Sequence, residues 1–140
     1  MATRDEIADA IAGMAIFVDL ARPQLIGVAS RFEEAFFPKD SRVLRQGLTG
    51  SGFYVIMDGE ADVVADGQKL ATLARGDFFG EVSVLLGEPP TADIIAKQAL
   101  RCLVLAPAAV EEFLVANPHV MYRVLQGEAR KLRTTTRWLS

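Results

Sequence analysis

At 140 residues and a formal net charge of −3, the chain has room for one domain and no general attraction for nucleic acid. Its 51% hydrophobic and 24% charged residues are typical of a globular protein and exclude a disordered chain. Cys102 is the only cysteine and His119 the only histidine, so we expect no disulfide, no metal and no resident cofactor. No uncharged apolar run reaches ~18 residues, and Asp5, Glu6 and Asp9 stand where a signal peptide needs basic residues, so we expect a cytosolic location without membrane contact.

The apolar residues of the first quarter of the chain recur at helical spacing. A short N-terminal helix is predicted by the apolar positions Ile7, Ile11, Met14, Phe17 and Val18. A second helix is predicted to begin at Pro23, because the fixed backbone angle of proline suits the first helical position. Its apolar face consists of Leu25, Val28, Ala29 and Phe32.

Residues 34–106 change to short apolar or alternating runs, which predict strands. The runs are Val43–Leu44, Phe53–Met57, Ala61–Ala65, Leu70–Leu73, Ile94–Ala96 and Leu100–Leu105. Turn-forming pairs separate the central runs at 8- to 10-residue intervals, and these pairs are Asp58-Gly59, Asp66-Gly67 and Gly76-Asp77. No helical segment interrupts these runs to allow a parallel crossover, so the spacing predicts an antiparallel roll.

Two further helices are predicted after the strands. Pro107 begins the first, over Ala108–Val115, and Asn117-Pro118 ends it. The last helix runs from about His119 to the C-terminus. It carries a short heptad seam of Leu125, Leu132 and Leu139 beside Tyr122, Ala129 and Thr136. Two interpretations of the seam stay open: it forms a parallel homodimer with a second copy, or it packs back onto the domain.

Two glycine-containing segments carry a family resemblance. The first comprises Gln46-Gly47, Gly50, Phe53–Ile56 and Gly59, and the second is residues 76–92, GDFFGEVSVLLGEPPTA. Together they resemble the central hairpin and phosphate-binding cassette of cyclic-nucleotide-binding domains in catabolite-activator-type regulators, protein kinase A regulatory subunits and nucleotide-gated channels. The resemblance implies one mainly β domain over residues 1–140, an eight-stranded double-stranded β-helix or jelly roll. N-terminal helices would occupy residues 1–33, the roll 34–106 and two C-terminal helices 107–140.

The resemblance also implies the function: a regulatory sensor, not an enzyme, that binds cAMP or cGMP and transmits occupancy through its C-terminal helix. Gly80 would let a ligand approach the backbone, and the first amides of a helix over residues 81–86 would face its phosphate. Glu81 would accept a hydrogen bond from the ribose 2′-hydroxyl, and the hydroxyl of Thr91 would donate to the phosphate. The other cassette residues expected at the ligand are Phe79, Val82, Ser83, Pro90 and Ala92.

Pro90 departs from the family pattern, which places an arginine there for the exocyclic phosphate oxygens. Proline supplies neither charge nor donor, and the loss of a charged hydrogen bond of ~1.5–3 kcal/mol weakens binding about ten- to hundredfold. Either the affinity is low, another cation substitutes, or the site is vestigial. Asp93 would add a negative charge if it faces the cassette, which strand alternation does not decide.

The last helix supplies the remaining candidates. Lys131, Thr135 and Thr136 resemble positions from which catabolite-activator regulators place a basic residue near the ribose and phosphate and two hydroxyls against the base. The basic run Arg130, Lys131, Arg133 and Arg137 equally suits a solvated face. We expect no DNA binding by this chain alone, because no helix-turn-helix follows. The alternative function is a ligand-free dimerisation or protein-interaction module that keeps the fold.

Overall fold

The computed structural model describes residues 2–48 and 52–136, the side chains of residues 135 and 136 apart. Its N-terminal part contains α1 (Arg4–Ile11), a 3-10 turn η1 (Ala15–Phe17) and α2 (Arg22–Arg31). A capping box begins α1: the Thr3 hydroxyl accepts from the Glu6 backbone N–H, and the Glu6 carboxylate accepts from the Thr3 backbone N–H, both at 3.1 Å. The helix predicted at Pro23 is confirmed as α2.

The first predicted helix is wrong beyond Ile11. Gly13, a poor helix former, lies in the turn that follows α1, and η1 then brings Ile16 and Phe17 into the core. Val18, which the helical spacing placed with the buried residues, is 53% exposed. The buried apolar residues of this segment therefore reach the core from two separate elements.

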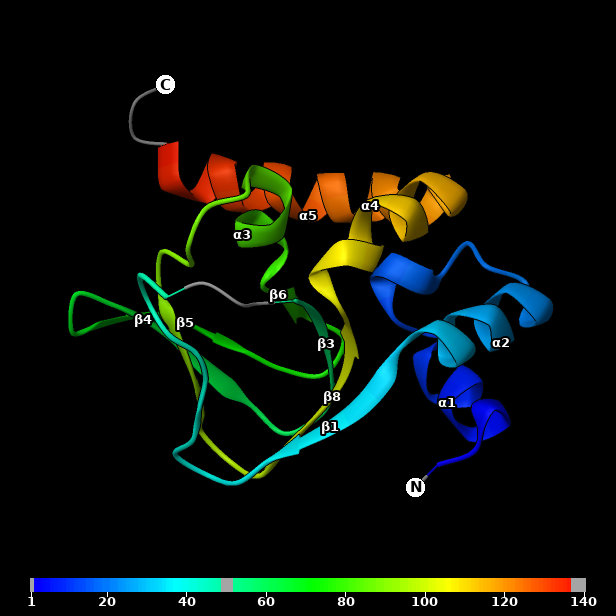
Figure 1. The fold of residues 1–140 in the computed structure, drawn as a ribbon, viewed down its shortest axis with the longest axis horizontal. Helices are drawn as coiled ribbons and strands as arrows, with labels where there is room; N and C mark the ends of the chain where they lie inside the picture. The colour runs from blue at the N-terminus through cyan, green and yellow to red at the C-terminus, as the bar shows by residue number, and fades with distance from the viewer. Residues whose placement is uncertain (1, 49–51, 137–140) are drawn as a thin grey trace.

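Eight strands in the described part of the chain form two antiparallel four-stranded sheets. One sheet has the order β1 (Glu33–Phe37), β8 (Leu100–Leu105), β3 (Phe53–Asp58), β6 (Phe78–Phe79). The other has the order β2 (Arg42–Leu44), β7 (Asp93–Ala96), β4 (Ala61–Ala65), β5 (Gln68–Leu73). Figure 1 shows α1 and α2 beside this roll and the later helices along one end of it. The predicted mainly β jelly roll with flanking helices is confirmed.

Aromatic side chains join the roll to the helices. Phe32 packs edge-on against Phe113 and Phe53, with ring centroids 5.1 and 6.1 Å apart. A second apolar cluster, contributed by both sheets, includes Phe79 and Cys102. Burial raises the pKa of the Cys102 thiol to about 12, so this side chain packs as an inert apolar group.

Three helices lie at the cassette end of the roll: α3 (Glu81–Leu86), α4 (Pro107–Ala116) and α5 (Pro118–Thr136). One stripe of α5 is buried through Val120 and Val124. Arg123 donates two hydrogen bonds to the Asp19 carboxylate, at 2.7 and 2.9 Å, which hold α5 on the segment after η1. The position of α5 is therefore fixed at its N-terminal half.

The heptad seam of α5 faces away from the roll. Leu125 is 63% exposed, Leu132 is 64% exposed, and Tyr122 and Ala129 are also exposed. The interpretation in which the seam packs back onto the domain is wrong for these four residues, because the stripe of Val120 and Val124 occupies the opposite side of the helix. Leu139 and the side chain of Thr136 lie outside the described residues.

Candidate ligand-binding site

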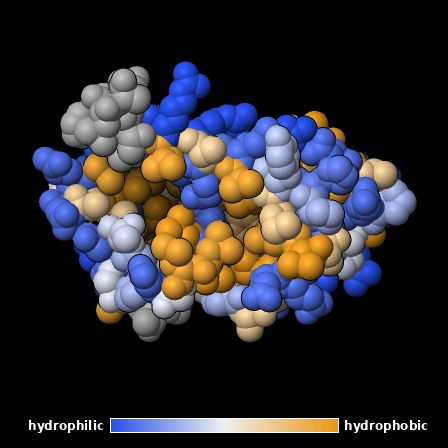
Figure 2. All heavy atoms as spheres, turned by 90° about the horizontal axis from the view of Figure 1, so that it is seen from above, coloured by the Kyte–Doolittle hydropathy of each residue, from blue (hydrophilic) through white to orange (hydrophobic). Residues whose placement is uncertain are grey.

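A cavity of about 540 Å³ lies between the roll, residues 78–92 and α5. This volume falls within the range of about 300–1,000 Å³ that is typical of small-molecule sites. Its roll side is apolar and is formed by strand residues that include Leu44, Val63, Leu73 and Ile94. Figure 2 shows apolar side chains gathered around a hollow on the face that carries the later helices.

Gly80 sets the backbone at the start of the cassette. Its φ is +86°, and a Cβ built there would lie 2.1 Å from the carbonyl oxygen of Gly52. Only glycine fits this close approach of two backbone segments. The preceding Phe79 ring stacks on Tyr54 with centroids 4.7 Å apart, which anchors the cassette to β3. Gly87, with φ of +65°, ends α3 after six residues.

Glu81 is the one charged residue of the described chain that is buried, at 2% exposure. Lys131 of α5 places its Nζ atom 3.4 Å from the Glu81 carboxylate, 3.4 Å from the Glu128 carboxylate and 4.7 Å from the centroid of the Phe78 ring. Burial, and then a hydrogen bond with the Glu128 carboxyl, raise the pKa of Glu81 to about 8 against the opposing attraction of Lys131. The cassette and α5 are therefore joined through a buried, readily protonated carboxyl group.

Residues 45–48 hold the second half of the cassette. The Gly47 backbone N–H donates to the Pro90 carbonyl at 2.9 Å, and the Gln46 backbone N–H donates to the Asp93 carboxylate at 2.7 Å. Arg42 is also ion-paired with Asp93, at 3.6 Å. Asp93 is thus bonded to the β2 side and does not line the cavity, which answers the question left open by the strand pattern.

The structure brings together nine of the eleven expected site residues around one cavity: Phe79, Gly80, Glu81, Val82, Ser83, Pro90, Thr91, Ala92 and Lys131. Pro90 is buried and Thr91 is exposed. The side chains of Thr135 and Thr136 lie outside the described residues, as does Gly50 of the first motif.

The sequence-based list missed Arg130 and Thr134, which also line the cavity from α5. Arg130 belongs to a run of similar basic residues, so its residue type alone could not show that it faces the cavity. The glycine at position 127 could have indicated the inward side of α5, because Gly127 packs against Phe78 of the roll. A Cβ at Gly127 would lie 2.8 Å from the Phe78 ring.

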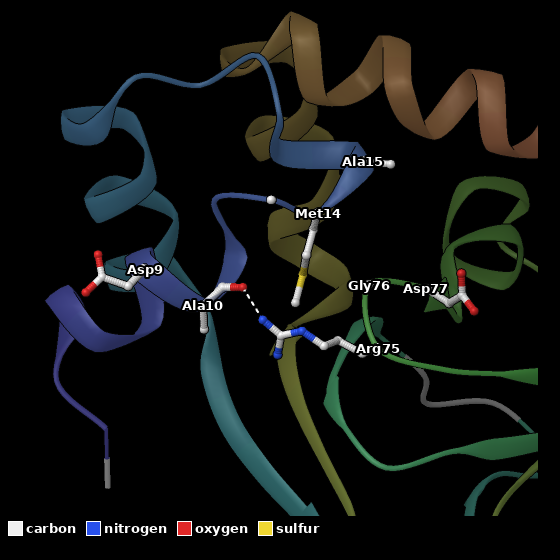
Figure 3. A pocket seen from close by; sticks show the side chains of 8 residues that line it. Asp9, Ala10, Met14, Ala15, Arg75, Gly76 and Asp77 are labelled. Carbon is white, nitrogen blue, oxygen red and sulfur yellow. Dashed lines mark hydrogen bonds between the residues drawn. The ribbon is translucent and has the colours of Figure 1, made fainter.

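A second hollow, of about 500 Å³, lies between α1 and the turn after β5 (Figure 3). Arg75 spans it and donates to the carbonyl oxygens of Ala10, at 2.6 Å, and Met57, at 2.8 Å. Asp77 accepts from the backbone N–H of Ala74 at 2.8 Å. Arg75 thus joins α1 to β3, Asp77 holds the turn, and Asp9, the third charged residue of the lining, is ion-paired with Arg22, so the hollow is a structural joint.

Neither a metal centre nor a membrane span is found in the part of the chain that the structure describes. Within residues 2–48 and 52–136, no three His, Cys, Asp or Glu side chains are grouped so that they could hold a metal ion. None of the helices described is long and apolar enough to cross a bilayer.

Comparison with known proteins identifies the family of the chain. The family model of the cyclic nucleotide-binding domain matches residues 34–117, which is more than half of the chain. The chain therefore belongs to the cyclic nucleotide-binding domain family.

Individual relatives include a protein kinase, a kinase regulatory subunit and a catabolite activator protein. The chain is 33% identical over 83 residues to a cGMP-dependent protein kinase of Plasmodium berghei (strain Anka), with 59% of this chain and 10% of the kinase covered. It is 33% identical over 91 residues to a cAMP-dependent protein kinase regulatory subunit of Mucor circinelloides f. lusitanicus, with 62% of this chain and 21% of the subunit covered. The crystal structure of Thermus thermophilus catabolite activator protein superposes with a TM-score of 0.81 at 25% identity, over 89% of this chain and 61% of that one. The chain thus spans between a tenth and about a fifth of the length of these two kinase relatives.

Proposed function

We propose that this chain is a regulatory sensor module that binds a cyclic purine nucleotide, cAMP or cGMP, and transmits its occupancy through α5 without catalysing a reaction. The observation that carries the proposal is the buried Glu81 carboxyl, which contacts Lys131 of α5 across the cavity. A ribose hydroxyl that donates to Glu81 competes with Lys131 for the same oxygen atoms. Ligand binding therefore changes the contact between the cassette and the last helix.

The chemistry of the cavity supports this class of ligand. Glu81 offers an acceptor for a sugar hydroxyl, Thr91 offers a hydroxyl donor for a phosphate, and the apolar strand residues offer a surface for a purine base. The names of the two relatives specify one cyclic nucleotide each, cGMP and cAMP, so they support the class and leave the choice of base to experiment. The cytosolic location stays a prediction.

The exposed seam of α5 supports a second part of the proposal, a parallel homodimer through this helix. Tyr122, Leu125, Ala129 and Leu132 present one apolar stripe along the helix. A two-fold interface is self-complementary, so a single stripe is sufficient to pair two copies. Because Lys131 and the seam share α5, a change at the cassette contact reaches the dimer interface along a rigid helix.

Isothermal titration calorimetry with cAMP and with cGMP tests the proposed function. We expect saturable binding of at least one of them with Kd below about 1 mM. Glu81→Ala removes the hydroxyl acceptor and, in titrations above about pH 8 where the Glu81 carboxyl is ionised, should weaken binding about ten- to hundredfold, which corresponds to the loss of a charged hydrogen bond. Glu111→Ala is the matched control, since Glu111 is an exposed carboxylate on α4 away from the cavity, and it should bind as the parent does.

The absence of binding by a folded parent chain would contradict the sensor proposal. That result would favour the alternative, a ligand-free interaction module that works through the α5 seam. Equal weakening by both carboxylate variants would show that lost affinity comes from net charge and not from the Glu81 contact.

A further inference from the structure

The two cationic side chains of the cavity wall differ in whether they are paired with carboxyl groups. Among the described residues, the ionisable side chains of the wall are Glu81, Glu88, Arg130 and Lys131. Lys131 lies 3.4 Å from both Glu81 and Glu128, so its charge is already matched by carboxyl groups. Within the described part of the wall, Arg130 is therefore the cation that remains for a ligand anion.

Arg130 is placed to serve an anion in the cavity. It precedes Lys131 on α5, its side chain is exposed, and no carboxylate of the described residues lies within ion-pair distance of it. A guanidinium group offers several coplanar donors, which match two oxygen atoms of one phosphate. An unmatched arginine in a cavity wall is thus suited to bind a phosphate.

The cassette side of the cavity lacks a cation of its own. Pro90 is buried in the wall, has no side-chain donor, and has its carbonyl engaged by the Gly47 backbone N–H at 2.9 Å. Thr91 contributes one neutral hydroxyl. The single negative charge of a cyclic phosphodiester bound beside these residues would find no matching positive charge in residues 78–92.

We propose that Arg130 binds the phosphate of the cyclic nucleotide and replaces, from α5, the cation that the cassette lacks at Pro90. This inference rests on the proposed function and adds the residue that binds the negatively charged group of the ligand. It also has a mechanical consequence, because the phosphate then contacts α5 directly. Binding of the anion holds the last helix against the cassette while the ribose competes for Glu81.

The test compares Arg130→Gln with Arg133→Gln by calorimetry, using cAMP and adenosine as probes. Arg133 is an exposed arginine on the same helix that does not line the cavity, so it is the matched control. Adenosine has the same base and ribose as cAMP but no phosphate. We expect Arg130→Gln to weaken cAMP binding about ten- to hundredfold, to leave adenosine binding unchanged, and to flatten the salt dependence of cAMP affinity. Arg133→Gln should change neither ligand's affinity by more than about twofold.

The outcomes separate this inference from the proposed function. If the parent binds cAMP and Arg130→Gln binds it equally well, the role of Arg130 is wrong and the sensor proposal stands. If Arg130→Gln weakens cAMP and adenosine alike, Arg130 acts through the shape of the site and the phosphate contact is wrong. If the parent binds neither cAMP nor cGMP, both proposals fail. Both variants change exposed positions, and thermal unfolding of each confirms that the fold is retained.

Discussion

The close approach of Gly80 to Gly52 makes Gly80→Ala a sharp test of the cassette geometry. Alanine at a φ of +86° costs about 1–2 kcal/mol of backbone strain. The new Cβ would also lie 2.1 Å from the Gly52 carbonyl oxygen and 3.2 Å from the Tyr54 ring, so backbone must move. Overpacking of this kind costs about 1–3 kcal/mol more. We therefore expect the free energy of unfolding to fall by about 2–5 kcal/mol in total.

Alanine variants of two other glycines measure the backbone strain alone, without the steric clash. Gly67→Ala and Gly87→Ala introduce a side chain at φ of +77° and +65°, with no atom within 4 Å of either new Cβ. These controls should lose about 1–2 kcal/mol, or about 4–8 °C in Tm, and Gly67→Ala should keep the parent's nucleotide affinity.

Thermal unfolding and calorimetric titration with cAMP measure the two effects on the same samples. Gly80→Ala should unfold at a lower temperature than both controls and bind cAMP at least about tenfold more weakly, because the cassette moves away from β3. If Gly80→Ala unfolds with the controls and binds as the parent does, the contact with Gly52 does not position the site and this reasoning fails.

Three further predictions concern the cation, the seam and the buried carboxyl. Because Arg130 is proposed to supply the cation already, Pro90→Arg should leave the cAMP affinity of the parent within about twofold and should restore the affinity that Arg130→Gln loses, by about ten- to hundredfold in a titration; tightening of the parent itself by that factor would mean that α5 does not supply the cation. Leu132→Glu should convert the dimer to a monomer in sedimentation at tens of micromolar without lowering the Tm of the roll, and a parent that is monomeric with and without nucleotide would refute the seam. The pKa of Glu81 is raised from 4.5 to about 8, so the folded chain holds a proton that the unfolded chain has lost between these values. The free energy of unfolding should therefore decline as pH rises from 4.5 to about 8 and level off above it, and chemical denaturation of Glu81→Gln should lack this contribution.

The strand pattern and the cassette motif were sufficient to predict the roll. Two strands escaped that analysis for physical reasons. β1 begins with the charged pair Glu33-Glu34, and its strand conformation comes from the pairing of all five of its residues with β8. β6 has two residues, Phe78 and Phe79, too few to show a period, and its pairing with β3 is a tertiary contact.

The two faces of α5 show what a single sequence does not decide. Both stripes are apolar: Val120 and Val124 on one side, and Leu125 and Leu132 on the other. Their spacing is equally helical, so periodicity alone cannot choose the buried side. The choice is made by Gly127, whose missing side chain lets α5 rest on the Phe78 ring.

Some residues of the candidate site could be predicted from the sequence, and others depend on tertiary packing. The cassette residues are consecutive in sequence and fold locally around Gly80, so a motif is enough to find them. Arg130 reaches the cavity only through the packing of α5 on the roll, and within a basic run it looks no different from Arg133. The role proposed for Arg130 follows from the ion pair between Lys131 and Glu81, which the sequence does not reveal.

The most direct test of the account is an amide-resolved NMR titration of the chain with cAMP. The account predicts saturable shifts below about 1 mM in the amides of residues 78–92 and in the part of α5 around Arg130 and Lys131. No shift in either segment at that concentration, or shifts confined to the hollow beside Arg75, would contradict the claim that this cavity binds the nucleotide and reports it through α5.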